Sequence, residues 1–381
     1  MEKHKALRII ISGGGTGGHI FPAISIANKM KELNPDSEIL FVGAEGKMEM
    51  EKVPAAGYKI VGLPIVGLQR QLNLHNIIND LKAPFKVLKS IRMAGKLISE
   101  FKPDIAIGVG GYASAPLLWA AERKGIPTLI QEQNGFAGLT NKILGKKAGC
   151  ICVAYEGMER FFDKEKIILT GNPVRQGLLK SINKEEAIRS FGLDPQKKTI
   201  LIVGGSLGAR TINNCVMKGL DKIKHSDVQF IWQTGKFYID EARKTVKQAG
   251  ELPMLYTTDF ISDMATAYSA ADLVISRAGA GSISEFCLLQ KPVILVPSPN
   301  VAEDHQTKNA LALVNKEAAL YVKDAEAENE LLDLAIKTVQ QPEVLKKLSN
   351  HIAALAFKDS ANVIAQEVCK LAEQYQQKHE H

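Results

Sequence analysis

The sequence is poor in cysteine, and its cysteines form no paired motif. Five occur in 381 residues, with no C-x-x-C spacing among them. An odd number without such spacing argues against a disulfide framework and against a zinc ribbon. We therefore expect reduced core residues in a protein of the cytosol. These residues are Cys150, Cys152, Cys215, Cys287 and Cys369.

Long apolar runs are also missing. No stretch approaches the roughly 18 apolar residues of a spanning helix. The opening segment, MEKHKALRIIISGGG, lacks the small-residue site at which a signal peptide is cleaved. The sequence therefore predicts a soluble or peripheral protein.

Aromatic residues are scarce, which bears on the kind of partner. They make up 6% of the chain, and Lys and Arg are scattered although the formal net charge is +7. Nucleic-acid surfaces combine clustered basic residues with aromatic stacking platforms. We predict no nucleic-acid partner. Phosphates or an anionic membrane surface suit the charge better.

Two ligand motifs are absent. No glycine run is followed by G-K-[ST], which excludes a P-loop. There is no Asp-x-Asp, and the closely spaced His379 and His381 lie in a polar tail. The sequence therefore predicts neither a metal nor another cofactor.

Short apolar runs alternate with helix-length segments along the whole chain, which is typical of parallel sheets covered by helices. We predict strands at Leu7–Ser12, Ile39–Val42, Ile105–Val109, Thr128–Gln131, Ile200–Val203, Phe230–Gln233, Leu273–Ser276 and Val293–Val296.

The two halves of the chain resemble each other. The strand and glycines that begin at Leu7 have a counterpart at Thr199, and the segment from Pro103 has one at Ala271. This repetition predicts two Rossmann-like α/β domains in tandem, with the change between them after Gly171–Asn172–Pro173. We place the domains at residues 1–175 and 176–357, and expect residues 358–381 to form a helix that packs back on the first domain.

Glycine loops follow the predicted strands. Gly13–Gly18 precedes His19 and a helix, and a loop of this kind can bring backbone N–H groups to an anion. It also satisfies G-x-G-x-x-G, although Glu45 is only a loose candidate for the acidic residue of a dinucleotide site. In the second half, Gly279–Ser282 is followed by Glu285. That pattern indicates either a nucleotide-sugar site or a simple capping box.

These residues resemble those of glycosyltransferase family 28, and the resemblance covers nearly the whole chain. It rests on Gly14–His19 with Phe21–Pro22, Gly110–Tyr112 with Ser114 and Pro116, Glu132–Gly135 with Ala137–Lys142, Gly171–Arg175, Gly204–Ser206 with Gly208–Arg210, Phe260–Ile261 with Asp263–Met264, Arg277 with Gly279–Ala280 and Glu285, and Gln306 with Asn309–Ala310.

The resemblance implies a GT-B fold, in which two Rossmann-like domains with parallel sheets face a central cleft. It also implies a hexosyltransferase that moves N-acetylglucosamine from UDP-GlcNAc, with inversion. The acceptor would be the C4 hydroxyl of the muramoyl sugar in undecaprenyl-diphospho-muramoylpentapeptide. Such an enzyme serves peptidoglycan synthesis as a peripheral protein on the cytoplasmic face of the bacterial inner membrane.

The resemblance also implies site residues. On the donor side, Ile261 would meet the uracil, Glu285 the ribose, and Gln306 the transferred sugar. The diphosphate would lie on Ser206, Arg175, Ala280, Gly281, Ser282, Ile283 and Ser284.

The first domain would supply the acceptor side and the catalytic groups. His19 is the predicted base or base-orienting group, although it could merely pack under its loop. Glu132 is a rival base that could equally be a hydrogen-bonded structural acid. The remaining predicted residues are Thr16, Gly17, Gly18, Tyr112 and Asn134.

The sequence departs from the family pattern at four positions. Gln131 and Trp232 stand where many relatives have histidine, Gly281 replaces a bulky residue, and His305 replaces a glutamine. The first change removes a titratable group beside Glu132.

The segment from Leu74 to Phe101 combines apolar residues at helical spacing with a basic set that includes Lys82, Lys86 and Lys89. Such a helix can rest on an anionic bilayer or can be an ordinary surface helix. Pro84 is expected to break or kink it.

Three other functions stay open. They are a UDP-N-acetylglucosamine 2-epimerase or a related GT-B enzyme with another acceptor, an NAD-dependent oxidoreductase, and a non-catalytic nucleotide-sugar binding protein.

Overall fold

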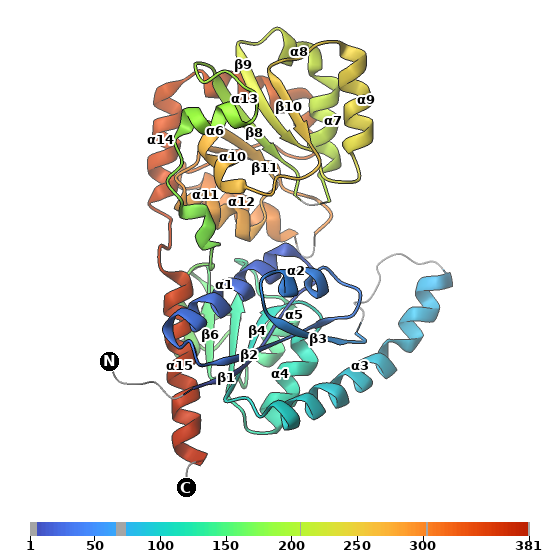
Figure 1. The fold of residues 1–381 in the computed structure, drawn as a ribbon, viewed down its shortest axis with the longest axis vertical. Helices are drawn as coiled ribbons and strands as arrows, with labels where there is room; N and C mark the ends of the chain where they lie inside the picture. The colour runs from blue at the N-terminus through green and yellow to red at the C-terminus, as the bar shows by residue number, and fades with distance from the viewer. Residues whose placement is uncertain (1–5, 66–73, 206, 302–303, 380–381) are drawn as a thin grey trace. The chain divides into compact units, whose positions relative to one another are not determined.

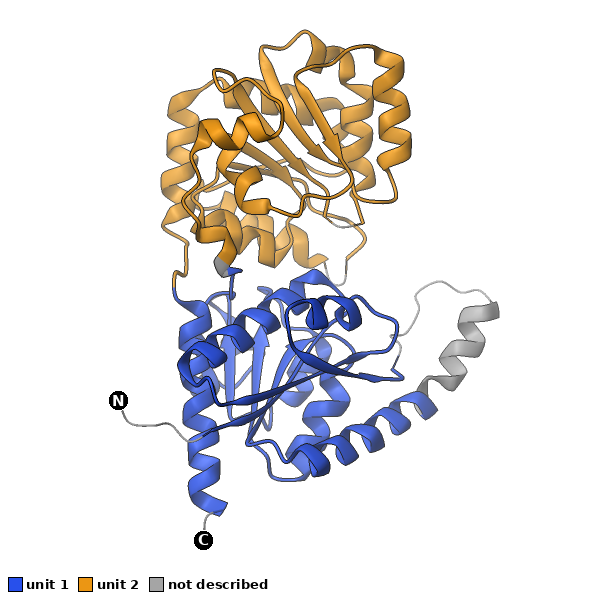
Figure 2. Cartoon of the chain, in the orientation of Figure 1, with its two compact units in different colours: residues 1–175, 359–381 blue, residues 176–358 orange. Residues whose placement is uncertain are grey.

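A computed structural model describes residues 6–65, 74–205, 207–301 and 304–379, without the side chains of 74–84 and 176. The chain divides into two compact units (Figure 2). The first comprises Met1–Arg175 with Asp359–His381, and the second comprises Gln176–Lys358.

The first unit is built on a seven-stranded parallel sheet with the order β3-β2-β1-β4-β5-β6-β7. In chain order, its strands are β1 (Arg8–Gly13), β2 (Glu38–Ala44), β3 (Lys59–Leu63), β4 (Ile105–Gly110), β5 (Thr128–Glu132), β6 (Cys150–Val153) and β7 (Ile167–Leu169). The central strands are almost fully buried, which explains their nearly continuous Ile, Val and Leu content.

The second unit repeats this plan with six strands in the order β10-β9-β8-β11-β12-β13. They are β8 (Lys198–Val203), β9 (Val228–Gln233), β10 (Leu255–Thr258), β11 (Leu273–Ser276), β12 (Val293–Leu295) and β13 (Leu320–Tyr321). Because the paired strands within each sheet are all parallel, helical crossovers must cover both faces.

Helices of the first unit are α1 (Gly17–Leu33), α2 (Glu49–Ala55), α3 (Leu74–Phe101), α4 (Ser114–Arg123), α5 (Leu139–Leu144) and α15 (Ser360–His379), with short 3-10 turns at Met158–Arg160 and Lys164–Lys166. The last helix, α15, lies beside α1 (Figure 1). Its Ile364, Val368 and Ala372 are buried in the same cluster as Ile9 and Ile26, so this helix completes the core of the first unit.

Helices of the second unit are α6 (Lys184–Ser190), α7 (Arg210–Lys218), α8 (Leu220–Lys224), α9 (Ile239–Ala249), α10 (Met264–Ala270), α11 (Ala280–Leu288), α12 (His305–Val314), α13 (Ala327–Val339) and α14 (Pro342–Ala353), after a 3-10 turn at Gln176–Leu179. The core of this unit centres on Phe230 and Trp232 of β9, which are fully buried.

The predicted class of two α/β domains with parallel sheets is confirmed. Each predicted strand is present within a residue or two, and the structure adds β3, β6, β7, β10 and β13. The sequence predicts that Pro84 breaks or kinks its helix, and a break is excluded because α3 continues through this position. None of the helices in the described parts of the chain combines the length and apolar character needed to cross a bilayer.

Both sheets have a switch point, where the strand order reverses direction beside the first strand of the unit. It lies between β1 and β4 in the first unit and between β8 and β11 in the second. Ligands of doubly wound sheets bind outside the carboxyl ends of strands at such points. The predicted glycine loops follow β1, β4, β8 and β11, so they flank the two switch points.

Candidate active site

The loop after β8 is shaped by glycines that touch backbone. Gly205 and Gly208 have φ angles of +81° and +90°, in the left-handed region that favours glycine. A Cβ atom on Gly208 would lie 2.3 Å from the carbonyl oxygen of Thr234. Gln233, at the end of β9, donates from Nε2 to the carbonyl oxygen of Gly205 at 3.0 Å. The predicted phosphate ligand Ser206 lies outside the described residues.

The second loop of this unit leads from β11 into α11. Gly279 is the N-cap residue, and Ala280, Gly281 and Ser282 form the first turn, where helical N–H groups lack intrahelical partners. Ser282 therefore lies inside the helix and cannot act as the N-cap of a capping box. Buried Ile283 anchors the turn in the core, and the Ser284 hydroxyl donates to the Ala280 carbonyl at 3.0 Å.

Glu285 follows one turn into α11 and is held by a residue that sequence reasoning missed. The hydroxyl of Tyr268 on α10 donates to Oε2 of Glu285 at 2.9 Å. Tyr268 is itself buried, with its ring edge-on to Phe286. The bond fixes the carboxylate beside the positive end of a helix, which is suitable for accepting hydrogen bonds from a vicinal diol.

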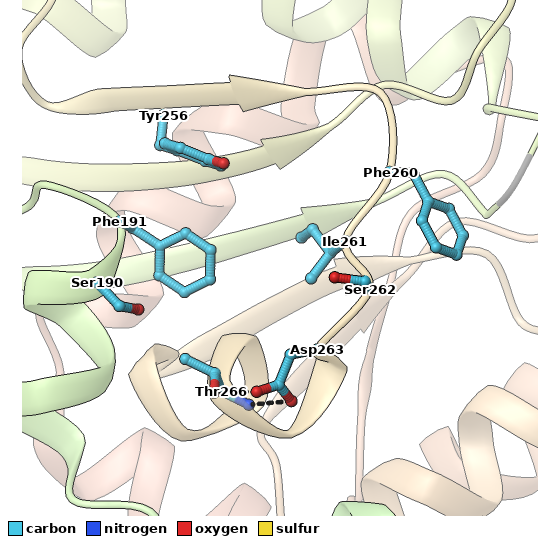
Figure 3. A pocket seen from close by; sticks show the side chains of 8 residues that line it. All are labelled: Ser190, Phe191, Tyr256, Phe260, Ile261, Ser262, Asp263 and Thr266. Carbon is cyan, nitrogen blue, oxygen red and sulfur yellow. Dashed lines mark hydrogen bonds between the residues drawn. The ribbon is translucent and has the colours of Figure 1, made fainter.

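A pocket of about 280 Å³ adjoins the segment after β10 (Figure 3). Its lining comes from the end of α6, from β10, and from the turn into α10; the residues are Ser190, Phe191, Tyr256, Phe260, Ile261, Ser262, Asp263 and Thr266. The rings of Phe191 and Tyr256 meet edge-to-face at 5.1 Å. The predicted uracil-binding residue Ile261 thus lines a pocket in which aromatic and polar side chains are mixed.

Gln306 and Arg277 are both engaged with the loop after β12. The Oε1 atom of Gln306, on the first turn of α12, accepts from the Ser298 amide at 2.9 Å. Arg277 donates to the carbonyl of Val296 at 3.0 Å and forms a half-buried ion pair with Asp324. Arg277 therefore stabilises this loop from inside the unit, and the partly buried Gln306 bonds to the same loop.

In the first unit, the loops after β1 and β4 are in direct contact. A Cβ atom on Gly111 would lie 2.5 Å from the Gly14 carbonyl oxygen, and one on Gly110 would lie 2.8 Å from Nε2 of His19. Both Gly110 and Gly111 have positive φ angles. Only glycine permits this approach, which places the His19 ring against the turn that leads to Tyr112.

His19 lies on the first turn of α1. Its Nδ1 atom is 2.9 Å from the carbonyl oxygen of Gly14 and 3.5 Å from the Thr16 hydroxyl. Because a carbonyl oxygen can only accept, the shorter contact requires a hydrogen on Nδ1. A neutral His19 then has its lone pair on Nε2, as a general base requires.

Glu132 is surrounded by donors. Its Oε1 accepts from the Asn134 amide at 3.1 Å and its Oε2 from the Gly138 amide at 3.2 Å and from Nδ2 of Asn141 at 2.8 Å. The side chain of Asn134 adds a longer bond at 3.4 Å. With 3% of its surface exposed, this carboxylate has the geometry of a structural acid that shapes the loop and places Asn134.

The other predicted residues of the first unit lie at its surface. Thr16, Gly17 and Gly18 form the turn into α1, and Tyr112 is half exposed after β4. Arg175 stacks its guanidinium over the ring of Phe21 at 4.8 Å, which restricts the side chain. Among the described residues, no group of three or more His, Cys, Asp or Glu side chains is placed to hold a metal ion.

Glycine turns at the switch points of two doubly wound sheets are typical of nucleotide-binding α/β proteins. Family models agree, since residues 9–153 match the glycosyltransferase family 28 N-terminal domain and residues 199–366 match its C-terminal domain. The chain belongs to glycosyltransferase family 28.

Close relatives carry one name. Proteins of Phocaeicola vulgatus and Bacteroides fragilis are 74% and 65% identical to this chain over 97% of both lengths. Each is named UDP-N-acetylglucosamine–N-acetylmuramyl-(pentapeptide) pyrophosphoryl-undecaprenol N-acetylglucosamine transferase.

Solved structures agree on the fold. The crystal structure of Acinetobacter baumannii MurG is 26% identical, with a TM-score of 0.74 over 96% of this chain and 100% of that one. A UDP-GlcNAc 2-epimerase from Neisseria meningitidis, at 15% identity and a TM-score of 0.66, covers 96% of this chain and 100% of its own. The second likeness shows the fold alone.

Proposed function

We propose that this chain transfers N-acetylglucosamine from UDP-GlcNAc to the C4 hydroxyl of the muramoyl sugar in undecaprenyl-diphospho-muramoylpentapeptide, with inversion. The name shared by relatives up to 74% identical supports this reaction and its place in peptidoglycan synthesis. The observation that carries it is Glu285, fixed by Tyr268 one turn into α11.

The second unit binds the donor in this proposal. Glu285 accepts hydrogen bonds from the ribose hydroxyls, and the first turn of α11 binds the diphosphate together with Ser206. Arg175, the last residue of the first unit, is a further proposed diphosphate ligand. The backbone of Ile261 contacts the uracil beside the pocket that Ile261 lines. The amide group of Gln306 contacts the transferred sugar.

The first unit binds the acceptor and supplies the base. Nε2 of His19 takes the proton from the C4 hydroxyl as the oxygen attacks the anomeric carbon. The bond from this carbon to the UDP oxygen breaks on the opposite face, so an α-linked donor gives a β-linked product. Asn134 and the Thr16–Gly18 turn contact the sugars, and Tyr112 positions the acceptor.

Charge develops on the departing UDP, and the donor site stabilises it. The N–H groups of the first α11 turn carry a partial positive charge, and the Arg175 guanidinium carries a full one. Preorganised donors of this kind contribute about 3 to 4 kcal/mol each in enzymes that have been dissected by mutation.

We also propose that the first unit rests on an anionic membrane at the cytoplasmic face. On α3, Phe85 is 77% exposed beside Lys86 and Lys89, and on α5, Leu139 is 69% exposed. The helices α3, α4 and α5 adjoin one another in sequence order. Exposed apolar side chains flanked by lysines are suited to a bilayer surface. Lys82, which belongs to the predicted basic set, has a side chain outside the described residues.

Transfer of labelled N-acetylglucosamine to the lipid-linked acceptor tests the reaction. We expect a β1→4-linked product that requires both substrates. Formation of UDP-N-acetylmannosamine without an acceptor would instead indicate an epimerase, and tighter binding of NADH than of UDP would indicate an oxidoreductase. Binding of UDP-GlcNAc with no turnover under any condition would leave only a binding protein.

Sedimentation with anionic liposomes tests the membrane contact. Replacing Phe85 and Leu139 with glutamate should abolish most of the binding. Leu33→Glu is the control, because Leu33 is an exposed apolar residue at the end of α1. Equal sedimentation of all three proteins would refute the assignment.

A further inference from the structure

A buried carboxylate lies beneath the first glycine loop. Glu49, the first residue of α2, is 1% exposed. Its Oε2 accepts from the Gly15 amide at 2.8 Å, and its Oε1 accepts from the Ala44 amide at 3.0 Å. Both oxygens therefore accept main-chain hydrogen bonds, one from the end of β2 and one from the loop.

Two glycines make room for this side chain. A Cβ atom on Gly14 would lie 2.2 Å from Oε1 of Glu49, and one on Gly43 would lie 2.6 Å from its Cγ. The φ angle of Gly15 is +83°, which turns its amide in a way that other residues rarely adopt. The loop and the end of β2 thus form a fitted compartment for one carboxylate.

The same peptide group connects Glu49 to His19. The carbonyl of Gly14 and the N–H of Gly15 belong to one planar amide, and in a trans peptide they point in opposite directions. Glu49 accepts at the N–H end, and Nδ1 of His19 donates at the carbonyl end, at 2.9 Å. A three-member chain runs from carboxylate through amide to imidazole.

We propose that Glu49 is a positioning residue for His19 and acts through the Gly14–Gly15 peptide. Its negative charge polarises the amide, so that the Gly14 oxygen becomes a stronger acceptor for Nδ1–H. This bond fixes the ring orientation and the tautomer with its lone pair on Nε2, against Gly110. The role of that lone pair as base rests on the proposed function, but the tautomer itself does not.

The tautomer can be measured without substrate. Nitrogen chemical shifts of a ¹⁵N-histidine-labelled full-length chain, at a pH where His19 is neutral, distinguish Nδ1–H from Nε2–H, and His19→Gln assigns the signal. We expect Nδ1–H in the wild type and a mixture of tautomers in Glu49→Gln. Predominant Nε2–H in the wild type overturns the proposal even if every variant fails to fold.

Two variants separate charge from packing. Glu49→Asp keeps the charge and should keep the Nδ1–H tautomer, whereas Glu49→Gln keeps the size and should lose it. Asp104→Asn is the matched control in the same unit, since the carboxylate of Asp104 also accepts a main-chain hydrogen bond, from the Arg8 amide at 2.7 Å, far from the loop. An unchanged tautomer in folded Glu49→Gln contradicts the proposal.

Steady-state kinetics of transfer test the role of Glu49 by a second method. In Glu49→Gln, kcat for transfer should fall about tenfold, a part of the roughly 10²- to 10⁴-fold that a general base contributes. The KM for UDP-GlcNAc should stay within about twofold, because no donor contact changes. If the wild type shows no transfer but the tautomer responds as expected, the proposed function fails while the role of Glu49 stands. An unchanged kcat together with an unchanged tautomer in a folded Glu49→Gln enzyme overturns that role, whereas an unchanged kcat with a changed tautomer removes His19 as the base.

Discussion

The glycine loops after β1 and β8 occupy equivalent places in their sheets, yet opposite chemistry holds them. In the first unit, the loop donates the Gly15 amide to the carboxylate of Glu49. In the second, the loop accepts at the Gly205 carbonyl from the Gln233 amide. Glu49 is the first residue of α2, which follows the neighbouring strand β2, and Gln233 ends the neighbouring strand β9. The first loop is therefore bonded to a carboxylate, whereas the second is bonded to a neutral side-chain amide.

At the amino ends of the central strands, the two sheets carry the same hydrogen bond. Asp104 precedes β4 and accepts from the Arg8 amide, and Asp272 precedes β11 and accepts from the Thr199 amide at 3.0 Å. An equivalent hydrogen bond thus links β1 to the start of β4 in the first unit and β8 to the start of β11 in the second. The frame is therefore duplicated. Under the proposed function, the residues at the carboxyl ends of the strands decide which unit binds the diphosphate and which supplies the base.

The largest effect is expected for His19→Ala. We predict that kcat falls about 10²- to 10⁴-fold, since the base is lost. The affinity for UDP should be unchanged, because His19 belongs to the other unit. Steady-state transfer and UDP titration measure the two quantities. A parallel loss of UDP affinity would contradict the proposal that the second unit binds UDP while the first supplies the base.

Glu285→Ala should show the reverse pattern. Loss of charge-assisted bonds to the ribose is expected to weaken UDP binding about 10- to 100-fold. Tyr268→Phe removes only the bond that orients the carboxylate and should cost less than Glu285→Ala. Isothermal titration with UDP compares them. Unchanged binding in Glu285→Ala would remove the ribose assignment.

The residue that bonds to the second loop can be changed to resemble its counterpart in the first unit. Gln233→Glu replaces the donor to Gly205 with a carboxylate like that of the first unit, and UDP affinity should fall about tenfold. Gln229→Glu is the control, because Gln229 is a buried glutamine at the other end of β9 that contacts Asp194 and Thr199. If both variants are folded and bind UDP equally well, the hydrogen bond from Gln233 to the loop does not contribute to UDP affinity.

The smallest expected effect is on stability and concerns the amino ends of the strands in the second sheet. There Lys291 donates to the Ala271 carbonyl at 3.1 Å. Burial, assisted by the charge of Lys184 and opposed by Asp272, lowers the pKa of Lys291 to about 8. The folded state then binds fewer protons than the unfolded state between pH 8 and the ordinary lysine pKa of 10.5, so stability rises with pH in this window.

Lys291→Met should remove that dependence. We expect the free energy of unfolding at pH 7 to rise by on the order of 1 kcal/mol, with little change at pH 10.5. Urea titrations at the two pH values, followed by the fluorescence of buried Trp232, provide the measurement. A variant that loses stability at pH 7 would show that the charged group is well accommodated.

The sequence predicts the frame well because buried parallel strands are runs of β-branched and aliphatic residues. It misses β7 and β13, which are edge strands of three and two residues. It also misses β3 and β10, whose residues are largely half-buried or exposed and show no continuous apolar run. Burial on both faces gives a continuous apolar run, and these edge strands lack it. Strand β6 is also absent from the predicted strands, although all four of its residues are buried.

For the site, glycine loops are visible in the sequence but their partners are not. Glu49 acts on an amide 34 residues away, and Tyr268 reaches Glu285 across 17 residues. Gln131 donates from Nε2 to Oδ1 of Asn172 at 2.9 Å within a buried amide network. Such contacts depend on which strands become neighbours, which local pattern does not encode. The glycines at 14 and 43, which admit Glu49, are the only local trace.

The most direct measurement is a crystal structure of this protein soaked with UDP-GlcNAc. The account predicts the ribose hydroxyls on Glu285, the diphosphate at the first turn of α11, and Glu49 still bonded to the Gly15 amide. A nucleotide bound at the Gly13–Gly18 loop, with Glu49 displaced, would contradict it.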